Sequence, residues 1–137
     1  IGMYAFAGCD RLRSVALDVQ YFEECAFCGC SRLRTASLPY ARSSVELFAN
    51  CTALESVSMP VAWRLRPRVF WACSSLATIS LPSVRVVEQQ AFAYCNRLET
   101  VFLPNLYAVA DDAFKDCPRL SNDKIFAPDR SKNTCPW

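Results

Sequence analysis

The feature that most constrains this chain is an internal repeat with a period of 21 or 22 residues. Each copy contains a phenylalanine, a cysteine three residues later and a leucine after three more. The phenylalanines are Phe6, Phe27, Phe48, Phe70, Phe92 and Phe114, the cysteines are Cys9, Cys30, Cys51, Cys73, Cys95 and Cys117, and the leucines are Leu12, Leu33, Leu54, Leu76, Leu98 and Leu120. Six copies of one pattern are not a coincidence, and a fixed period of this length is typical of solenoids and related repeat architectures.

The second half of each copy has the pattern of a short strand. Apolar and small polar residues alternate after the leucine, as in Ser56-Val57-Ser58-Met59, which is the period of a strand with one buried face. A proline, which cannot donate to a ladder, then ends the strand in most copies, at Pro39, Pro60, Pro82 and Pro104. The unit is therefore A-F-x-x-C-x-x-L-x-x-V-x-L-P, in which A-F-x-x-C forms a turn of helix or an irregular return arm.

One copy cannot bury its own apolar side chains, so the copies are predicted to stack, with Phe on Phe, Cys on Cys and Leu on Leu. The unit is similar to the repeat of the BspA-like class of leucine-rich repeats, which is known from surface proteins of bacteria and from large protein families of protists. The likeness covers residues 1 to about 126. It implies a binding or adhesion scaffold without enzymatic activity.

We therefore predict an α/β repeat solenoid, a leucine-rich-repeat right-handed coil with one short parallel strand per copy and irregular or short helical return arms. Residues 1–126 form this solenoid, with the first and last copies incomplete, and residues 127–137 form a C-terminal cap or tail. The first copy begins within an arm, at Ile1, without a polar cap, which indicates a longer array or an edge that a partner covers. In the last copy Asp123 falls at a core position and Ile125 at the next one.

The composition excludes much common enzyme chemistry. The chain has no histidine, so it has no Ser/His or Cys/His nucleophilic pair and no histidine-ligated metal. Three glycines are too few for a glycine-rich phosphate cradle. A net charge of +2 does not indicate a nucleic-acid partner, and no apolar run approaches the roughly 20 residues of a membrane span. We expect no enzyme, no cofactor, no nucleic-acid partner and no membrane insertion in this segment.

Nine cysteines raise the question of disulfides or a metal. The six ladder cysteines are expected to be free buried thiols, although stacking at about 5 Å is within the range of a disulfide. Cys25-x-x-Cys28-x-Cys30 resembles a zinc motif, but Cys30 belongs to the inward ladder, so the three thiols are not expected to converge. We predict no metal site, and a local Cys25–Cys28 disulfide stays an open alternative.

Residues on either side of the buried strand centre, all hydroxyl-bearing except one phenylalanine, are predicted to form a concave face that holds a protein or glycan ligand. The candidates are Ser14, Thr35, Ser37, Ser56, Ser58, Thr78, Ser80, Thr100 and Phe102. The alternative is that serine and threonine simply suit exposed strand positions.

Arginines form two further groups, whose stacked guanidinium groups could receive an acidic partner or a sulfated glycan. The first consists of Arg11, Arg13, Arg32 and Arg34, and the second of Arg64, Arg66 and Arg68. Glu55 and Glu99 take the Arg34 position in later copies, so the basic stripe is interrupted and a solvated face is the alternative.

Our hypothesis is a non-catalytic protein-interaction scaffold that binds a protein, or a glycan, through the strand face or a basic arm and belongs to a longer array. The family resemblance favours the cell surface or secretion and a role in adhesion. The alternative function is a structural subunit embedded in a large intracellular assembly, because unpaired thiols and an uncapped apolar end suit such a place.

Overall fold

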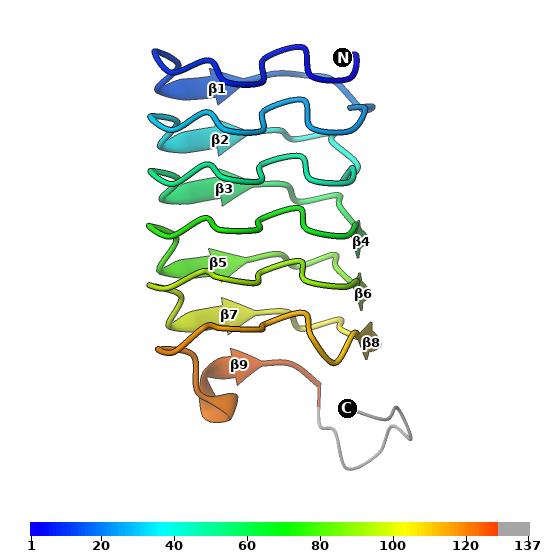
Figure 1. Ribbon diagram of the computed structural model, residues 1–137. Helices are drawn as coiled ribbons and strands as arrows, with labels where there is room; N and C mark the ends of the chain where they lie inside the picture. Colours follow the sequence, from blue (N-terminus) through cyan, green and yellow to red (C-terminus); the bar gives the residue numbers. More distant parts are fainter. Residues whose placement is uncertain (129–137) are drawn as a thin grey trace.

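The computed structural model describes residues 1–128, which form a stack of similar rungs (Figure 1). The strands are short. They are β1 (Ser14–Ala16), β2 (Thr35–Ser37), β3 (Ser56–Ser58), β4 (Arg64–Leu65), β5 (Thr78–Ser80), β6 (Val86–Val87), β7 (Thr100–Phe102), β8 (Ala108–Val109) and β9 (Ile125–Phe126), with one 3₁₀ turn, η1 (Asn122–Lys124).

All strand pairs are parallel, as the prediction of a solenoid requires. One face of the stack carries two three-stranded sheets, β1-β2-β3 and β5-β7-β9, and the opposite edge carries a third, β4-β6-β8 (Figure 1). Equivalent residues pair: Val15 lies beside Ala36, and Ala36 beside Val57. The predicted stacking of parallel strands is confirmed.

The third sheet was not predicted, because we expected one strand in each copy. Strands β4, β6 and β8 occur in the three arms that precede Phe70, Phe92 and Phe114. Those arms follow Met59, Leu81 and Leu103, and each has one residue more before its phenylalanine than the arms that follow Leu17 and Leu38. We attribute the second strands to this added residue, which gives the arm room for two extended residues.

The return arms contain no α-helix within residues 1–128, so the alternative of short helical arms was wrong. Alternate main-chain N–H groups of the arm donate hydrogen bonds to the next copy. Phe27 donates to the Leu47 oxygen at 3.0 Å and Gly29 to the Ala49 oxygen at 2.8 Å. Two residues are left-handed in the turn of each of the first five copies, such as Cys25 with φ of 56° and Gly29 with φ of 69°, and one, Asp116, in the last copy. A right-handed helix cannot continue through left-handed residues, and the arm becomes a series of turns bonded to the next copy.

The core between the faces is built of the predicted ladders. Phe27, Phe48, Phe70 and Phe92 have no exposed surface, and the rings of Phe48 and Phe70 stack with centroids 5.8 Å apart and planes 3° from parallel. No polar or charged residue of the described chain is buried in this core. Apolar burial of this kind is the main stabilising force of the stack.

The last copy departs from the predicted register. We placed Asp123 at an inward position and Ile125 one inward position further on, but Ile125 pairs with Val101 and Asp123 is exposed. The turn η1 adds two residues before the strand and shifts its register. Most of the expected cap or tail, residues 129–137, lies outside the described residues.

Candidate functional site

The strand face presents the side chains that the sequence predicted there. In each copy the strand centre is inward and its two neighbours point outward, so that Ser37, Ser58 and Ser80 are exposed in one row. Thr100 is half-buried, and Phe102 keeps 45% of its surface exposed, in loose contact with Phe126. The face is therefore a hydroxyl-rich surface with an aromatic side chain toward one end.

A hollow of about 440 Å³ lies in this face where the sheet is interrupted. Strands β3 and β5 belong to separate hydrogen-bonded sheets, and the copies change from 21 to 22 residues at the same place. The hollow is lined by Glu55, Ser56, Val57, Thr78, Ile79, Ser80, Thr100 and Phe102. It brings five of the predicted candidates, one of which is the aromatic Phe102, together with two strand centres and a carboxylate.

The first arginine group borders the same face. Arg13 and Arg34 immediately precede β1 and β2, and together with Arg32 and Ala53 they line a hollow of about 280 Å³. Within residues 1–128, no carboxylate forms an ion pair with Arg13, Arg32 or Arg34. Their positive charge is therefore available to a ligand.

The second arginine group is paired within the molecule. Arg64 and Arg66 both contact the Glu88 carboxylate, the latter at 3.7 Å between Nη1 and Oε2. Arg68 Nη1 lies 3.2 Å from Glu46 Oε1. These carboxylates were not predicted as partners because they are 22 or 24 residues away, in neighbouring copies. The pairing leaves this arm with little free positive charge.

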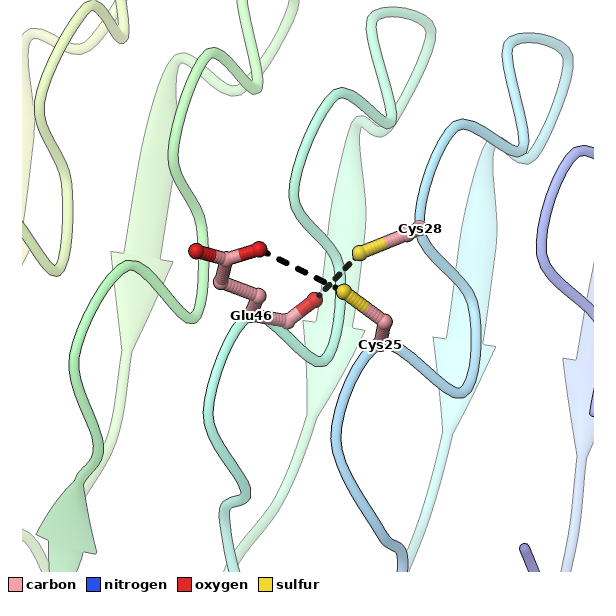
Figure 2. A group of neighbouring side chains, drawn as sticks. All are labelled: Cys25, Cys28 and Glu46. Atoms are coloured by element: carbon pink, nitrogen blue, oxygen red, sulfur yellow. Dashed lines mark hydrogen bonds between the residues drawn. The ribbon is translucent and has the colours of Figure 1, made fainter. Parts of the chain in front are cut away.

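The sulfur atoms of Cys25 and Cys28 converge with Glu46 of the next copy (Figure 2). Cys25 and Glu46 are equivalent residues, each left-handed and two residues before a core phenylalanine. Cys25 Sγ donates to Glu46 Oε2 at 3.3 Å, and Cys28 Sγ donates to the Glu46 main-chain oxygen at 3.0 Å. The three ligand atoms all lie within 4.8 Å of one another.

The sequence motif groups Cys25 and Cys28 with Cys30, and the expected separation of Cys30 from the other two thiols is confirmed. The Cys30 thiol donates to the Phe6 oxygen at 3.1 Å, as a member of the ladder. Glu46 was not predicted as a member of this cluster, although its position one copy after Cys25 was a signal for it.

The thiols of this cluster are protonated at neutral pH. Burial raises the pKa of Cys28, and the nearby Cys25 thiol and the charge of Glu46 raise it further. Burial also raises the pKa of Cys25. Both sulfurs are therefore hydrogen-bond donors, Cys25 to the Glu46 carboxylate and Cys28 to the Glu46 main-chain oxygen.

Parallel strands stacked at a period of 21 or 22 residues over inward leucines define a leucine-rich-repeat solenoid. The family model described as BspA type leucine rich repeat region matches six copies over residues 1–121. The chain belongs to this family, as the resemblance of its repeat predicted. A comparison with curated proteins finds no match.

Solved structures with the same fold support this assignment. A leucine-rich cell surface protein of Faecalibacterium prausnitzii is similar over 89% of this chain and 33% of its own, with 28% identity and a TM-score of 0.79. A leucine-rich repeat protein of T. pallidum is similar over 80% of this chain and 57% of its own, with 29% identity and a TM-score of 0.74. A leucine-rich repeat protein of Bacteroides ovatus, 21% identical over 86% of this chain and 38% of its own, shares the fold with a TM-score of 0.65.

The chain thus spans between one third and three fifths of the length of these structures. Repeats of this kind are typical of protein-interaction scaffolds, and such proteins are generally not enzymes. Residues 1–128 include no helix that is long and apolar enough to cross a membrane.

Proposed function

We propose that this chain is a non-catalytic binding module that holds a protein ligand on its strand face at the cell surface. The observation that carries the proposal is the hollow at the interruption between β3 and β5, because it places hydroxyls, a carboxylate and Phe102 around one depression. An exposed aromatic ring beside hydrogen-bonding groups is the composition of a protein-binding site.

The dimensions of the face suit an extended ligand. Strands β1, β2, β3, β5 and β7 lie about 4.8 Å apart, so the face is roughly 20 Å long. The unpaired Arg13 and Arg34 border one end, and Phe102 lies toward the other. A ligand with acidic residues at one end and an apolar side chain at the other would complement both.

Location of this chain at the cell surface is supported by its family and by one of the similar solved structures. That structure is described as a leucine-rich cell surface protein. Adhesion to another protein is the role that we infer for such a module, and a glycan is the alternative ligand.

The test compares two charge-adding variants as baits for surface-protein extracts. Thr78→Arg fills the hollow between β3 and β5, whereas Gln89→Arg adds the same charge to an exposed residue of the arm, just after β6. We expect proteins captured by the wild-type chain to be retained by Gln89→Arg and lost with Thr78→Arg.

Equal capture by both variants would contradict a site on the strand face. Protease treatment of the extract should abolish the binding. If the binding survives protease but not glycosidase treatment, the ligand is a glycan and the proposal of a protein ligand is wrong. Arg13→Ser with Arg34→Ser should weaken capture most at low salt, because exposed charges act through screened attraction.

A further inference from the structure

The cluster of Cys25, Cys28 and Glu46 has no part in the proposed strand-face function and is not explained by the repeat. Ladder cysteines recur in every copy, but Cys25 and Cys28 do not. At the position of Cys28, one residue after the phenylalanine, three other copies have Ala7, Ala49 and Ala93. The scaffold therefore forms without a thiol at this place.

The position of Cys25 is equally free of a structural demand for sulfur. In four of the other copies the equivalent residue is Tyr4, Glu46, Arg68 or Gln90, and each has the same left-handed conformation. The last copy has Asp112, which does not. Nothing in the backbone of this turn requires cysteine. Two thiols that converge on a carboxylate therefore call for a chemical explanation.

The carboxylate is oriented by the next copy. Arg68 Nη1 holds Glu46 Oε1 at 3.2 Å, and Arg68 Nε donates to Gln90 Oε1 at 3.1 Å. This arrangement leaves Glu46 Oε2 directed at Cys25 Sγ (Figure 2). An outer partner that fixes one carboxylate oxygen while the other ligates is the usual support of a protein metal site.

The donor atoms fit a tetrahedral cation of the size of zinc. Zinc binds thiolate sulfur at about 2.3 Å and carboxylate oxygen at about 2.0–2.2 Å, which places neighbouring ligand atoms roughly 3.5 Å apart. Cys25 Sγ and Glu46 Oε2 are 3.3 Å apart, and all three ligand atoms lie within 4.8 Å. Cys25 and Glu46 are thus already at about the separation of two ligands of one such cation.

We propose that Cys25, Cys28 and Glu46 bind one thiophilic divalent cation, Zn²⁺ above all, with water as the fourth ligand. Thiolate ligands select zinc over magnesium or calcium, which prefer oxygen alone. Two sulfur–metal bonds form as the two thiol protons pass to solvent, and no oxidant or reductant takes part. The negative charges of two thiolates and one carboxylate balance the positive charges of the cation and of the adjacent Arg68.

The role of this site is to join two copies of the array. Cys25 and Cys28 belong to one copy and Glu46 to the next, so the cation cross-links neighbouring rungs within the arm. Because a cation that binds only the folded chain stabilises it, zinc should raise the unfolding midpoint of the protein.

The experiment titrates the full chain, reduced with a phosphine, with Zn²⁺ against a chromophoric chelator and with Co²⁺ for its spectrum. We expect one zinc per chain and a thiolate-to-cobalt charge-transfer band with visible bands of tetrahedral geometry. Cys28→Ala, which copies Ala49, should lose stoichiometric zinc and halve the charge-transfer band. Glu46→Gln, which copies Gln90, should weaken zinc binding by about tenfold or more.

The matched control is Cys9→Ala, because Cys9 is an exposed thiol outside the cluster. It should bind zinc as the wild-type chain does. The proposal is overturned if the reduced chain takes up no zinc, if Cys28→Ala binds zinc like the wild type, or if Cys9→Ala loses it equally. Unfolding midpoints of the zinc-free variants, expected to match the wild type, separate loss of the site from loss of the fold.

Discussion

The thiol of Cys73 donates a hydrogen bond to the main-chain oxygen of Phe48 in the preceding copy, at 3.2 Å. The same oxygen accepts the N–H of Cys51 at 3.1 Å. The relationship recurs along the array, from Cys95 to Phe70 at 3.1 Å. The ladder cysteine is therefore both a small core side chain and a polar link between neighbouring copies.

Replacing this thiol should cost a moderate amount of stability. Cys73→Ala removes a buried sulfur and one hydrogen bond, and we expect a loss of about 1–2 kcal/mol in the free energy of unfolding. The exposed Cys9 provides the control, since Cys9→Ala should change stability by less than about 0.5 kcal/mol. Urea unfolding measures both, and equal stabilities of the two variants would contradict a structural role of the ladder.

The buried thiols should also make the fold sensitive to alkali. Burial raises the pKa of the Cys73 thiol, so the unfolded chain loses this proton more readily than the folded chain. The resulting stability is present below about pH 8.5, the ordinary pKa of a cysteine thiol, and is lost as the pH rises above it. Between about pH 7 and about pH 10 the urea unfolding midpoint should therefore fall less in Cys73→Ala than in the wild-type chain. An identical fall in both would refute the contribution of this thiol.

The phenylalanine stack should dominate the stability of the core. Phe70 is fully buried between the rings of Phe48 and Phe92, with centroids at 5.8 and 5.3 Å. Phe70→Ala should cost about 3–5 kcal/mol, because it leaves a cavity at the centre of the stack. Ser58→Ala, on the exposed strand face, should cost less than about 0.5 kcal/mol. Calorimetry or urea unfolding compares the two, and a mild effect of Phe70→Ala would contradict the stacked core.

A left-handed turn position should accept glycine with a gain in stability. Ala72 has φ of 57° at the position where the first two copies have Gly8 and Gly29. A left-handed conformation costs a residue with a Cβ roughly 1–2 kcal/mol, and the greater freedom of glycine in the unfolded chain offsets part of this. We expect Ala72→Gly to stabilise the protein by about 0.5–1 kcal/mol.

Two variants check the explanation of this gain. Ala77 does not have a positive φ, so Ala77→Gly should destabilise the chain by about 0.5–1 kcal/mol. Gly29→Ala should be destabilising through the backbone alone, since the added Cβ would have no neighbour closer than 3.9 Å. A stabilising Ala77→Gly or a neutral Gly29→Ala would show that backbone conformation does not set these effects.

Much of the fold could be predicted because each copy repeats the same physical problem. The apolar positions of the unit had to be buried, and only stacking could bury them, so the inward positions of Phe48, Leu54 and Val57 followed from their spacing. The exposure of Ser58 and Ser80 followed from strand alternation. The form of the arms did not follow, because consecutive apolar and polar residues there suit a turn or a helix equally well.

The sequence by itself determined the period, the parallel strands, the inward ladders and the outward strand face, since these depend only on which side chains avoid water. The tertiary structure decided what lies between copies: the pairing of Arg68 with Glu46, the convergence of Cys25 and Cys28 on that carboxylate, and the hollow between β3 and β5. Such contacts join residues about one copy apart, and they depend on arm length and on the left-handed backbone that aims each side chain. Periodicity predicts which residues stack and which of them face inward, whereas only the folded chain shows which side chains of neighbouring arms meet.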